Sequence, residues 1–284
     1  MMINTQAFFD TKTNTVTYLV WHDESREALV IDPVLDYEPH AARLDTYSAD
    51  GVIKAVEDKG LTLTWVLDTH AHADHLSAGH YIREKTGAKL GIGAHIEQVQ
   101  SFFHPFFGAP NEPIHTETFD ALFKDGQTFQ LGDNTVKVLF TPGHTAACVT
   151  YLIADMAFVG DTLFMPDYGT ARADFPGGNS SILYKSIQKI LSLPETTRIM
   201  VGHDYRPEGR DVHRWESTVA DQRKNIHLNG KTEADYVEMR DARDATLSAP
   251  RLILPALQVN IHGGALPPVE RDGHIYLKIP INRI

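Results

Sequence analysis

The chain opens with strand-like patterns that give way to helical spacing. Residues 14–21 and 27–31 are rich in β-branched and aromatic residues and predict two strands joined by a polar turn. Residues 48–59 instead repeat their apolar positions with the period of a helix, and Gly60 stands where a C-cap is expected. We therefore expect strands covered by helices from the beginning of the chain.

The same patterns continue through the rest of the chain. Strands are predicted at residues 62–68, 89–92, 135–140, 148–153, 156–159 and 198–201. Helices are predicted at residues 76–86, 94–103, 180–191, 216–225 and 232–246, the last opened by a capping box of Thr232 and Asp235. Segments rich in Pro and Gly, which predict no long regular element, are residues 104–113, 164–178 and 250–284. The mixture, with hairpins in each half, indicates an α/β protein whose sheets are not purely parallel.

Composition narrows the class of protein. With 284 residues, of which 42% are hydrophobic, the chain can bury a substantial core. A formal net charge of −11 argues against nucleic acid or an anionic membrane as the partner. The single cysteine, Cys148, excludes an internal disulfide, and its place in a predicted strand indicates a buried side chain. No signal sequence or membrane-length apolar run is visible, so we expect a cytoplasmic protein.

Candidate chemistry gathers at the ends of four predicted strands. Residues 69–75 (Thr-His-Ala-His-Ala-Asp-His), hereafter the His-rich loop, place three imidazoles and a carboxylate directly after one buried strand. His144, Asp161 and His203 each follow a later strand, and each is preceded by a glycine, which lets the backbone approach a ligand closely. Imidazole and carboxylate ligands without thiolate suit zinc, iron or manganese. The spacing thus predicts a metal site.

The pattern His-x-His-x-Asp-His, followed by a Gly-His, a Gly-Asp and a final Gly-His, resembles the ligand set of the metallo-β-lactamase superfamily. The resemblance covers residues 18–205. It implies an αββα sandwich, in which two mixed β-sheets are flanked by helices, with the metal at one edge. We expect a catalytic domain over residues 1–246 and a C-terminal extension over residues 247–284 that packs on the same domain.

Finer features resemble the persulfide dioxygenase family, that of the ethylmalonic-encephalopathy protein. The similar segments are residues 68–75, 160–164 (Gly-Asp-Thr-Leu-Phe), 172–175 (Arg-Ala-Asp-Phe) and 202–205 (Gly-His-Asp-Tyr). Ala173 departs from the pattern, because many members have threonine there. Residues 259–264 (Val-Asn-Ile-His-Gly-Gly) resemble the longer bacterial branch of the family.

The resemblance implies one Fe(II) per chain, bound by His70, His144 and Asp161, the two-histidine, one-carboxylate set of non-haem iron oxygenases. It implies that O2 oxidises the terminal sulfur of glutathione persulfide to sulfite, that glutathione is released, and that no catalytic residue acts beyond the metal centre. The remaining candidates orient the ligands or form the second metal site of dinuclear relatives: His72, Asp74, His75 and His203.

Substrate contacts are expected close to the ligand segments. Glutathione carries carboxylates that need cationic or phenolic partners, and Arg172 and Tyr205 are the candidates. Arg172 could instead pair with Asp174 at the surface, and Tyr205 could pack at a sheet edge. The aromatic segment 102–107 and the tail lead us to expect a homodimer or a higher homo-oligomer.

A glyoxalase II-like hydrolase is the alternative function. Such an enzyme cleaves glutathione thioesters with two zinc ions and a bridging hydroxide. All the ligands that either function needs are present, so ligand identity does not separate them. The segments around Arg172 and Tyr205 favour the dioxygenase.

Overall fold

The computed structural model describes residues 2–109, 111, 114 and 117–283, which form two large sheets and one small one. The first sheet has the order β1-β2-β3-β6-β8-β9, from Ile3–Asp10 (β1), Thr15–His22 (β2), Glu27–Ile31 (β3), Thr62–Leu67 (β6), Lys89–Gly93 (β8) and Ala121–Phe123 (β9). The second has the order β10-β11-β12-β13-β14-β15, from Thr128–Leu131 (β10), Asn134–Phe140 (β11), Val149–Ile153 (β12), Met156–Gly160 (β13), Arg198–Val201 (β14) and Glu216–Thr218 (β15). The small sheet β5-β4-β7 consists of Val34–Glu38 (β4), Arg43–Asp45 (β5) and Leu76–Ser77 (β7).

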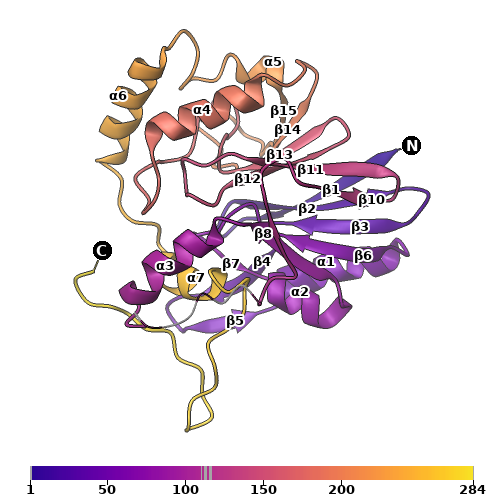
Figure 1. Cartoon of the computed structure of the whole chain (residues 1–284), viewed down its shortest axis with the longest axis vertical. Coiled ribbons are helices and arrows are strands. Elements are labelled where there is room, and N and C mark those ends of the chain that lie inside the picture. The colour runs from indigo at the N-terminus through magenta and orange to yellow at the C-terminus, as the bar shows by residue number, and fades with distance from the viewer. Residues whose placement is uncertain (1, 110, 112–113, 115–116, 284) are drawn as a thin grey trace.

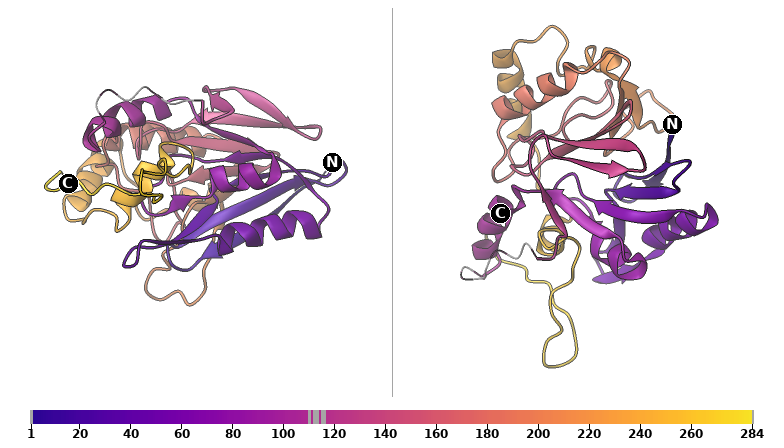
Figure 2. Two further views of the ribbon diagram at one scale, coloured as in Figure 1. Left: turned by 90° about the horizontal axis from the view of Figure 1, so that it is seen from below. Right: turned by 45° about the vertical axis from the view of Figure 1, so that its right-hand side comes forward.

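Helices cover the outer faces of the two large sheets. They are Tyr47–Asp58 (α1), Gly79–Thr86 (α2), Ile96–Phe106 (α3), Ser180–Leu191 (α4), Val219–Gln222 (α5), Glu233–Asp244 (α6) and Ile253–Asn260 (α7). Figure 1 shows α1, α2, α3 and α7 on the side of the first sheet and α4, α5 and α6 on the side of the second, and the right-hand view of Figure 2 shows the same layers. The predicted αββα sandwich is confirmed. Across the described part of the chain, no helix is long and apolar enough to span a lipid bilayer.

Alternating side chains make both faces of the large sheets apolar. In β2, Tyr18 is buried between the sheets, whereas its neighbour Leu19 packs toward the helices. In β14, Met200 points between the sheets and Ile199 packs against the helices on the other side. A strand buried on both faces needs a continuous apolar run, which is why these strands were recognisable in the sequence. The core therefore has three layers, one between the sheets and one beneath each set of helices.

Every predicted strand is present, and the predicted helices at 48–59, 94–103, 180–191 and 232–246 are confirmed as α1, α3, α4 and α6. The predicted capping box of α6 is formed as well. Two helix predictions are wrong in part. The segment 76–86 opens with β7, which pairs with β4, and the segment 216–225 opens with β15, which pairs with β14. Sheet pairing overrides the helical spacing at both places.

The tail is more regular than its Pro and Gly content predicts. It contains α7, from which Ala256, Leu257 and Val259 are buried in the core layer beneath the first sheet. The extension therefore contributes side chains to the same core as the helices α1 and α2. The domain boundary between residues 246 and 247 stays a prediction.

Candidate metal centre

The His-rich loop and the later candidate ligands meet at one edge of the two sheets. The loop follows β6, His144 follows β11, Asp161 follows β13 and His203 follows β14. His70, His144 and Asp161, hereafter the first group, offer ligand atoms that all lie within 4.8 Å of one another. Asp161 Oδ2 is 3.9 Å from His70 Nε2 and 3.7 Å from His144 Nε2. The residues that were predicted to bind iron are thus neighbours.

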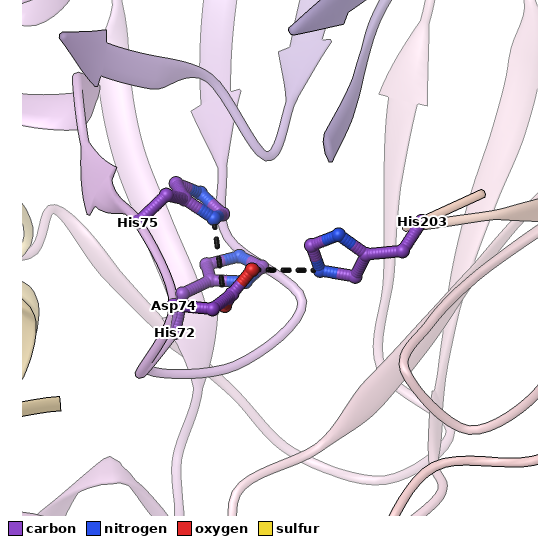
Figure 3. A group of neighbouring side chains, drawn as sticks. All are labelled: His72, Asp74, His75 and His203. Atoms are coloured by element: carbon purple, nitrogen blue, oxygen red, sulfur yellow. Dashed lines mark ion pairs between the residues drawn. The ribbon is translucent and has the colours of Figure 1, made fainter. Parts of the chain in front are cut away.

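His72, Asp74, His75 and His203, hereafter the second group, also have ligand atoms within 4.8 Å of one another. Figure 3 shows Asp74 in ion pairs with His75 of the same loop and with His203, which comes from the opposite side. His203 Nε2 lies 3.3 Å from Asp74 Oδ2 and 3.2 Å from Asp161 Oδ1. Asp161 therefore faces both groups, and the fold brings all the predicted ligands into one centre.

Asp32, at the end of β3, orients two of the loop histidines. Its carboxylate accepts hydrogen bonds from the Thr69 N–H at 2.7 Å and the Thr69 hydroxyl at 2.9 Å, and it lies 3.0 Å from His72 Nε2. Because the Thr69 proton points to Asp32, the Thr69 oxygen accepts from His70 Nδ1, which is 3.0 Å away. His70 therefore keeps the lone pair of Nε2, and His72 that of Nδ1, for a metal. Asp32 directly follows the strand predicted at 27–31, and that position at a strand end is the signal that points to it in the sequence.

Backbone carbonyls orient two further histidines. His144 Nδ1 donates to the carbonyl of Arg172 at 2.8 Å, and His203 Nδ1 donates to the carbonyl of Asn14 at 3.2 Å. A carbonyl can only accept, so each ring carries its proton on Nδ1 and leaves the lone pair of Nε2 toward the centre. Neither carbonyl could be found from the sequence, since backbone groups carry no residue-type signal.

A chain of hydroxyl groups orients the last histidine, His75. Its Nδ1 lies 3.2 Å from Thr15 Oγ1, which lies 2.8 Å from Thr13 Oγ1. The Thr13 hydroxyl donates to Asp10 Oδ2 at 2.6 Å, so Thr15 donates to Thr13 and accepts from His75. His75 Nδ1 also lies 3.6 Å from Asp74 Oδ1, and His75 Nε2 is buried without a hydrogen-bond partner among the described residues. Each of the candidate histidines thus has one ring nitrogen held by an oxygen, as metal-bound histidines do.

The inward-facing atoms fit a cation as their common partner. Buried polar atoms that have no hydrogen-bond partner among the described residues include His70 Nε2, His72 Nδ1, Asp74 Oδ2, His75 Nε2, Asp161 Oδ1 and His203 Nε2. A buried polar atom without a hydrogen bond costs about 1–3 kcal/mol, so a cation that these atoms could bind would stabilise the cluster. Burial lowers the pKa of His70 and of His72 well below the ordinary value, which keeps both in the neutral form that binds a metal. The residues of a metal-binding site are present.

Glycine is required beside the centre for two reasons. Gly160 has a φ of +50°, and a Cβ there would lie 2.4 Å from Thr69 Oγ1. Gly143 has a φ of +134°, and a Cβ there would lie 2.3 Å from the backbone of Leu183. Both the left-handed backbone and the close approach exclude a side chain. The glycines that precede His144 and Asp161 in the sequence pattern thus have a structural cause.

The two predicted substrate contacts lie beside the centre with partners of their own. The Arg172 guanidinium donates to the two carboxylate oxygens of Asp174 at 2.6 and 2.7 Å and to the Ser248 carbonyl at 2.8 Å. The Tyr205 ring stacks on His203, with ring centroids 5.4 Å apart and an interplanar angle of 14°. Arg172 is thus in the ion pair considered as its alternative role, and contact with substrate stays a prediction for both residues.

The family model of the metallo-β-lactamase superfamily matches residues 10–203, which include every candidate ligand. The chain belongs to this superfamily, whose fold and metal-binding residues it has. A β-lactamase hydrolase-like protein of Xylella fastidiosa (strain Temecula1) is 49% identical over 279 residues, which cover 98% of this chain. The chain spans only 64% of that relative's length.

Two further relatives point to different activities. Glyoxylase B2 of Dictyostelium discoideum is 42% identical over 282 residues, which cover 98% of this chain and 96% of that protein. The mitochondrial persulfide dioxygenase ETHE1 of Bos taurus is 31% identical over 267 residues, which cover 93% of this chain and 89% of that protein. The crystal structure of ETHE1 from Myxococcus xanthus superposes with a TM-score of 0.74 at 29% identity, covering 93% of this chain and 100% of that one. The chain is therefore a homologue of the ETHE1 persulfide dioxygenases.

Proposed function

We propose that the chain is a persulfide dioxygenase that oxidises the terminal sulfur of glutathione persulfide with O2, after which water cleaves the sulfur–sulfur bond and sulfite and glutathione are released. The observation that carries the proposal is the first group, in which two imidazoles and one carboxylate are drawn together in a homologue of ETHE1. This donor set suits a single Fe(II) with open positions. Bound iron would supply sites at which the persulfide sulfur and O2 meet.

The chain's own residues hold that site in shape. Asp32, acting through Thr69, fixes the ring of His70, and the Arg172 carbonyl fixes the ring of His144. His70, His144 and Asp161 are all buried, whereas the Asp74 side chain is 25% exposed, so the centre is most open on the side of Asp74. Exclusion of bulk water from the deeper side protects the reactive sulfur from side reactions.

Arg172 and Tyr205 are proposed to bind glutathione. Arg172 lies next to the first group, because its backbone carbonyl contacts His144, and its guanidinium would exchange Asp174 for a substrate carboxylate. Losing a charge-assisted hydrogen bond costs about 1.5–3 kcal/mol, so Arg172→Ala should raise the apparent KM at least tenfold and leave iron content intact. An unchanged KM would assign Arg172 to the ion pair only. Arg198→Ala, which removes another exposed ion pair, serves as the control.

A dinuclear thioester hydrolase is the second candidate. It is favoured by the second group, in which Asp74, His75 and His203 lie together, and by Asp161, which faces both groups. The similarity to glyoxylase B2 supports the same function. Two cations would then share Asp161, and Asp74, His75 and His203 would bind the second one.

Metal content measured together with oxygen uptake separates the two candidates. The chain is purified without added metal, its metal is quantified, and O2 consumption is followed with glutathione persulfide beside hydrolysis of a glutathione thioester. We expect about one iron per chain and O2 uptake matched by sulfite. Two zinc ions per chain, thioester hydrolysis and no uptake would replace the dioxygenase by the hydrolase.

The ligand assignment is tested with His144→Ala. Two remaining ligands should not retain Fe(II), so the variant should lose its iron. His40→Ala is the control, because His40 is exposed and far from His144 in the sequence, and this variant should keep its iron. Full iron retention in His144→Ala would show the assignment to be wrong. We also propose that the protein forms a homo-oligomer and is located in the cytoplasm. Light scattering of the purified chain tests the oligomeric state.

A further inference from the structure

Asn260, the last residue of α7, uses its whole amide group on the His-rich loop and on Ser77, two residues after the loop. It is 1% exposed. Its Nδ2 donates to the carbonyls of His72 at 2.8 Å and His75 at 2.7 Å, and its Oδ1 accepts from the Ser77 N–H at 2.7 Å. One side chain from the C-terminal extension thus contacts a loop whose residues His72 and His75 lie 188 and 185 residues away in the sequence.

Two of these hydrogen bonds satisfy loop carbonyls that belong to no sheet or helix, and the third satisfies an N–H of the short strand β7. The loop runs between β6 and β7 without regular structure and is buried at His72 and His75, and Ser77 in β7 is buried as well. A buried carbonyl or N–H left unpaired costs about 1–3 kcal/mol. Only an asparagine of this length offers two donors and one acceptor here, because aspartate has no donor and glutamine is longer.

The residues after Asn260 press the extension against the same segment. The Gly263 carbonyl accepts from the His80 N–H at 2.8 Å. Gly264 has a φ of +89°, and a Cβ there would lie 2.4 Å from the Ser77 carbonyl oxygen. The Gln100 side chain of α3 donates to the carbonyl of Ile261, the residue after Asn260, at 2.7 Å and so holds the end of α7 in place. The Val-Asn-Ile-His-Gly-Gly segment is therefore shaped to lie on the backbone that follows the His-rich loop.

We propose that Asn260 is a positioning residue of the metal centre. It fixes the backbone on both sides of Asp74, so that His72, Asp74 and His75 keep their places without Asn260 touching a metal. His70 lies outside the fixed stretch and is held by Thr69, so the second group depends on Asn260 more than the first. The proposal rests on the metal site itself and holds for either proposed reaction.

Metal affinity of the full chain tests the proposal. Zn²⁺ binding is measured by chelator competition on metal-free protein for the unchanged chain, Asn260→Ala, Asn260→Asp and Gln258→Ala. Gln258 is the matched control, because it also makes three hydrogen bonds from α7, to Leu254 and Lys278, but none to the loop. Loss of a residue that supports metal ligands costs about 10–100-fold in affinity. We expect this loss in both Asn260 variants and less than about threefold in Gln258→Ala.

The thermal midpoint of the metal-free variants separates positioning from folding. If Asn260 only stabilised the fold, the folded fraction of each variant would bind Zn²⁺ as tightly as the unchanged chain, and that result would overturn the proposal. Asn260→Asp keeps the acceptor for Ser77 and removes only the two donors to the loop carbonyls.

A measurement on the unchanged chain provides an independent test. Coupling between two sites is reciprocal, so Zn²⁺ must slow hydrogen exchange at the Ser77 amide if Asn260 supports the metal. Exchange at Ser77 that Zn²⁺ leaves unaltered would contradict the proposal even if no variant folds. None of these readouts involves persulfide or thioester turnover, so failure here is distinct from failure of the proposed function.

Discussion

Asp244 in α6 forms a buried ion pair with Arg240, and the pair holds the backbone that orients His144. Arg240 is 1% exposed and Asp244 is 3% exposed. Arg240 donates from Nε to Asp244 Oδ1 at 3.0 Å and from Nη1 to the Thr170 carbonyl at 3.1 Å. Asp244 Oδ2 accepts from the Ala173 N–H at 2.7 Å. The two anchored residues flank the carbonyl that accepts from His144, so this pair supports both folding and the metal centre.

Replacing Asp244 by alanine leaves the Arg240 guanidinium and the Ala173 N–H buried without their partner. Removing one member of a buried ion pair costs about 3–5 kcal/mol, and the orphaned N–H costs about 1–3 kcal/mol. The two costs overlap, because Arg240 can shift toward the Thr170 carbonyl. We therefore expect the free energy of unfolding to fall by roughly 5 kcal/mol. For a chain of this size that lowers the melting temperature by on the order of 10–20 °C.

Urea unfolding of the metal-free chain measures this change, with two comparison variants. Glu216→Ala removes an exposed pair with Arg198, whose side chains are 45% and 31% exposed, and should cost only about 0–1 kcal/mol. Arg240→Met combined with Asp244→Leu leaves no buried charge unpaired, and so should recover more than half of the loss. The reasoning is refuted if Asp244→Ala costs no more than Glu216→Ala, or if the apolar pair recovers nothing.

Three further predictions follow from the structure. Burial lowers the pKa of His227 to about 4, below the value of about 6.5 for an unfolded chain. Between these two pH values the unfolded state binds more protons than the folded state. The free energy of unfolding should therefore be highest above about pH 6.5 and fall by roughly 2–3 kcal/mol toward pH ~4. In His227→Asn, urea midpoints measured across this range should vary less with pH, and an unchanged slope would contradict the assignment. Burial raises the pKa of the Cys148 thiol to about 12, so iodoacetamide at about pH 8 should alkylate it only after unfolding, and rapid labelling of the native chain would disprove this. Gly160→Ala adds a Cβ against Thr69 and should weaken Zn²⁺ binding about tenfold or more. Gly209→Ala is the control, because its backbone is similarly strained but its Cβ would meet open space, and it should leave Zn²⁺ binding unchanged. Equal Zn²⁺ affinities of the two variants would rule out the steric explanation.

Much of the sandwich could be predicted from local patterns. Strands such as β2 and β14 are buried on both faces, so they appear in the sequence as continuous apolar runs. The helix predicted at 76–86 was wrong at its start because Leu76 and Ser77 pair with β4, which is a long-range contact. The helix α7 was missed because the Pro and Gly content of the tail masks the apolar residues that dock it on the first core.

The sequence by itself determined which residue types stand at the strand ends, and therefore that a metal centre of imidazole and carboxylate ligands was expected there. Strand ends are local features, and the ligands lie next to them in the chain. Only the tertiary structure decided which ring nitrogen of each histidine is held by an oxygen, because Asp32, Thr15 and two backbone carbonyls make that choice through contacts between distant segments. The same holds for Asn260, whose role exists only once α7 has docked beside the His-rich loop.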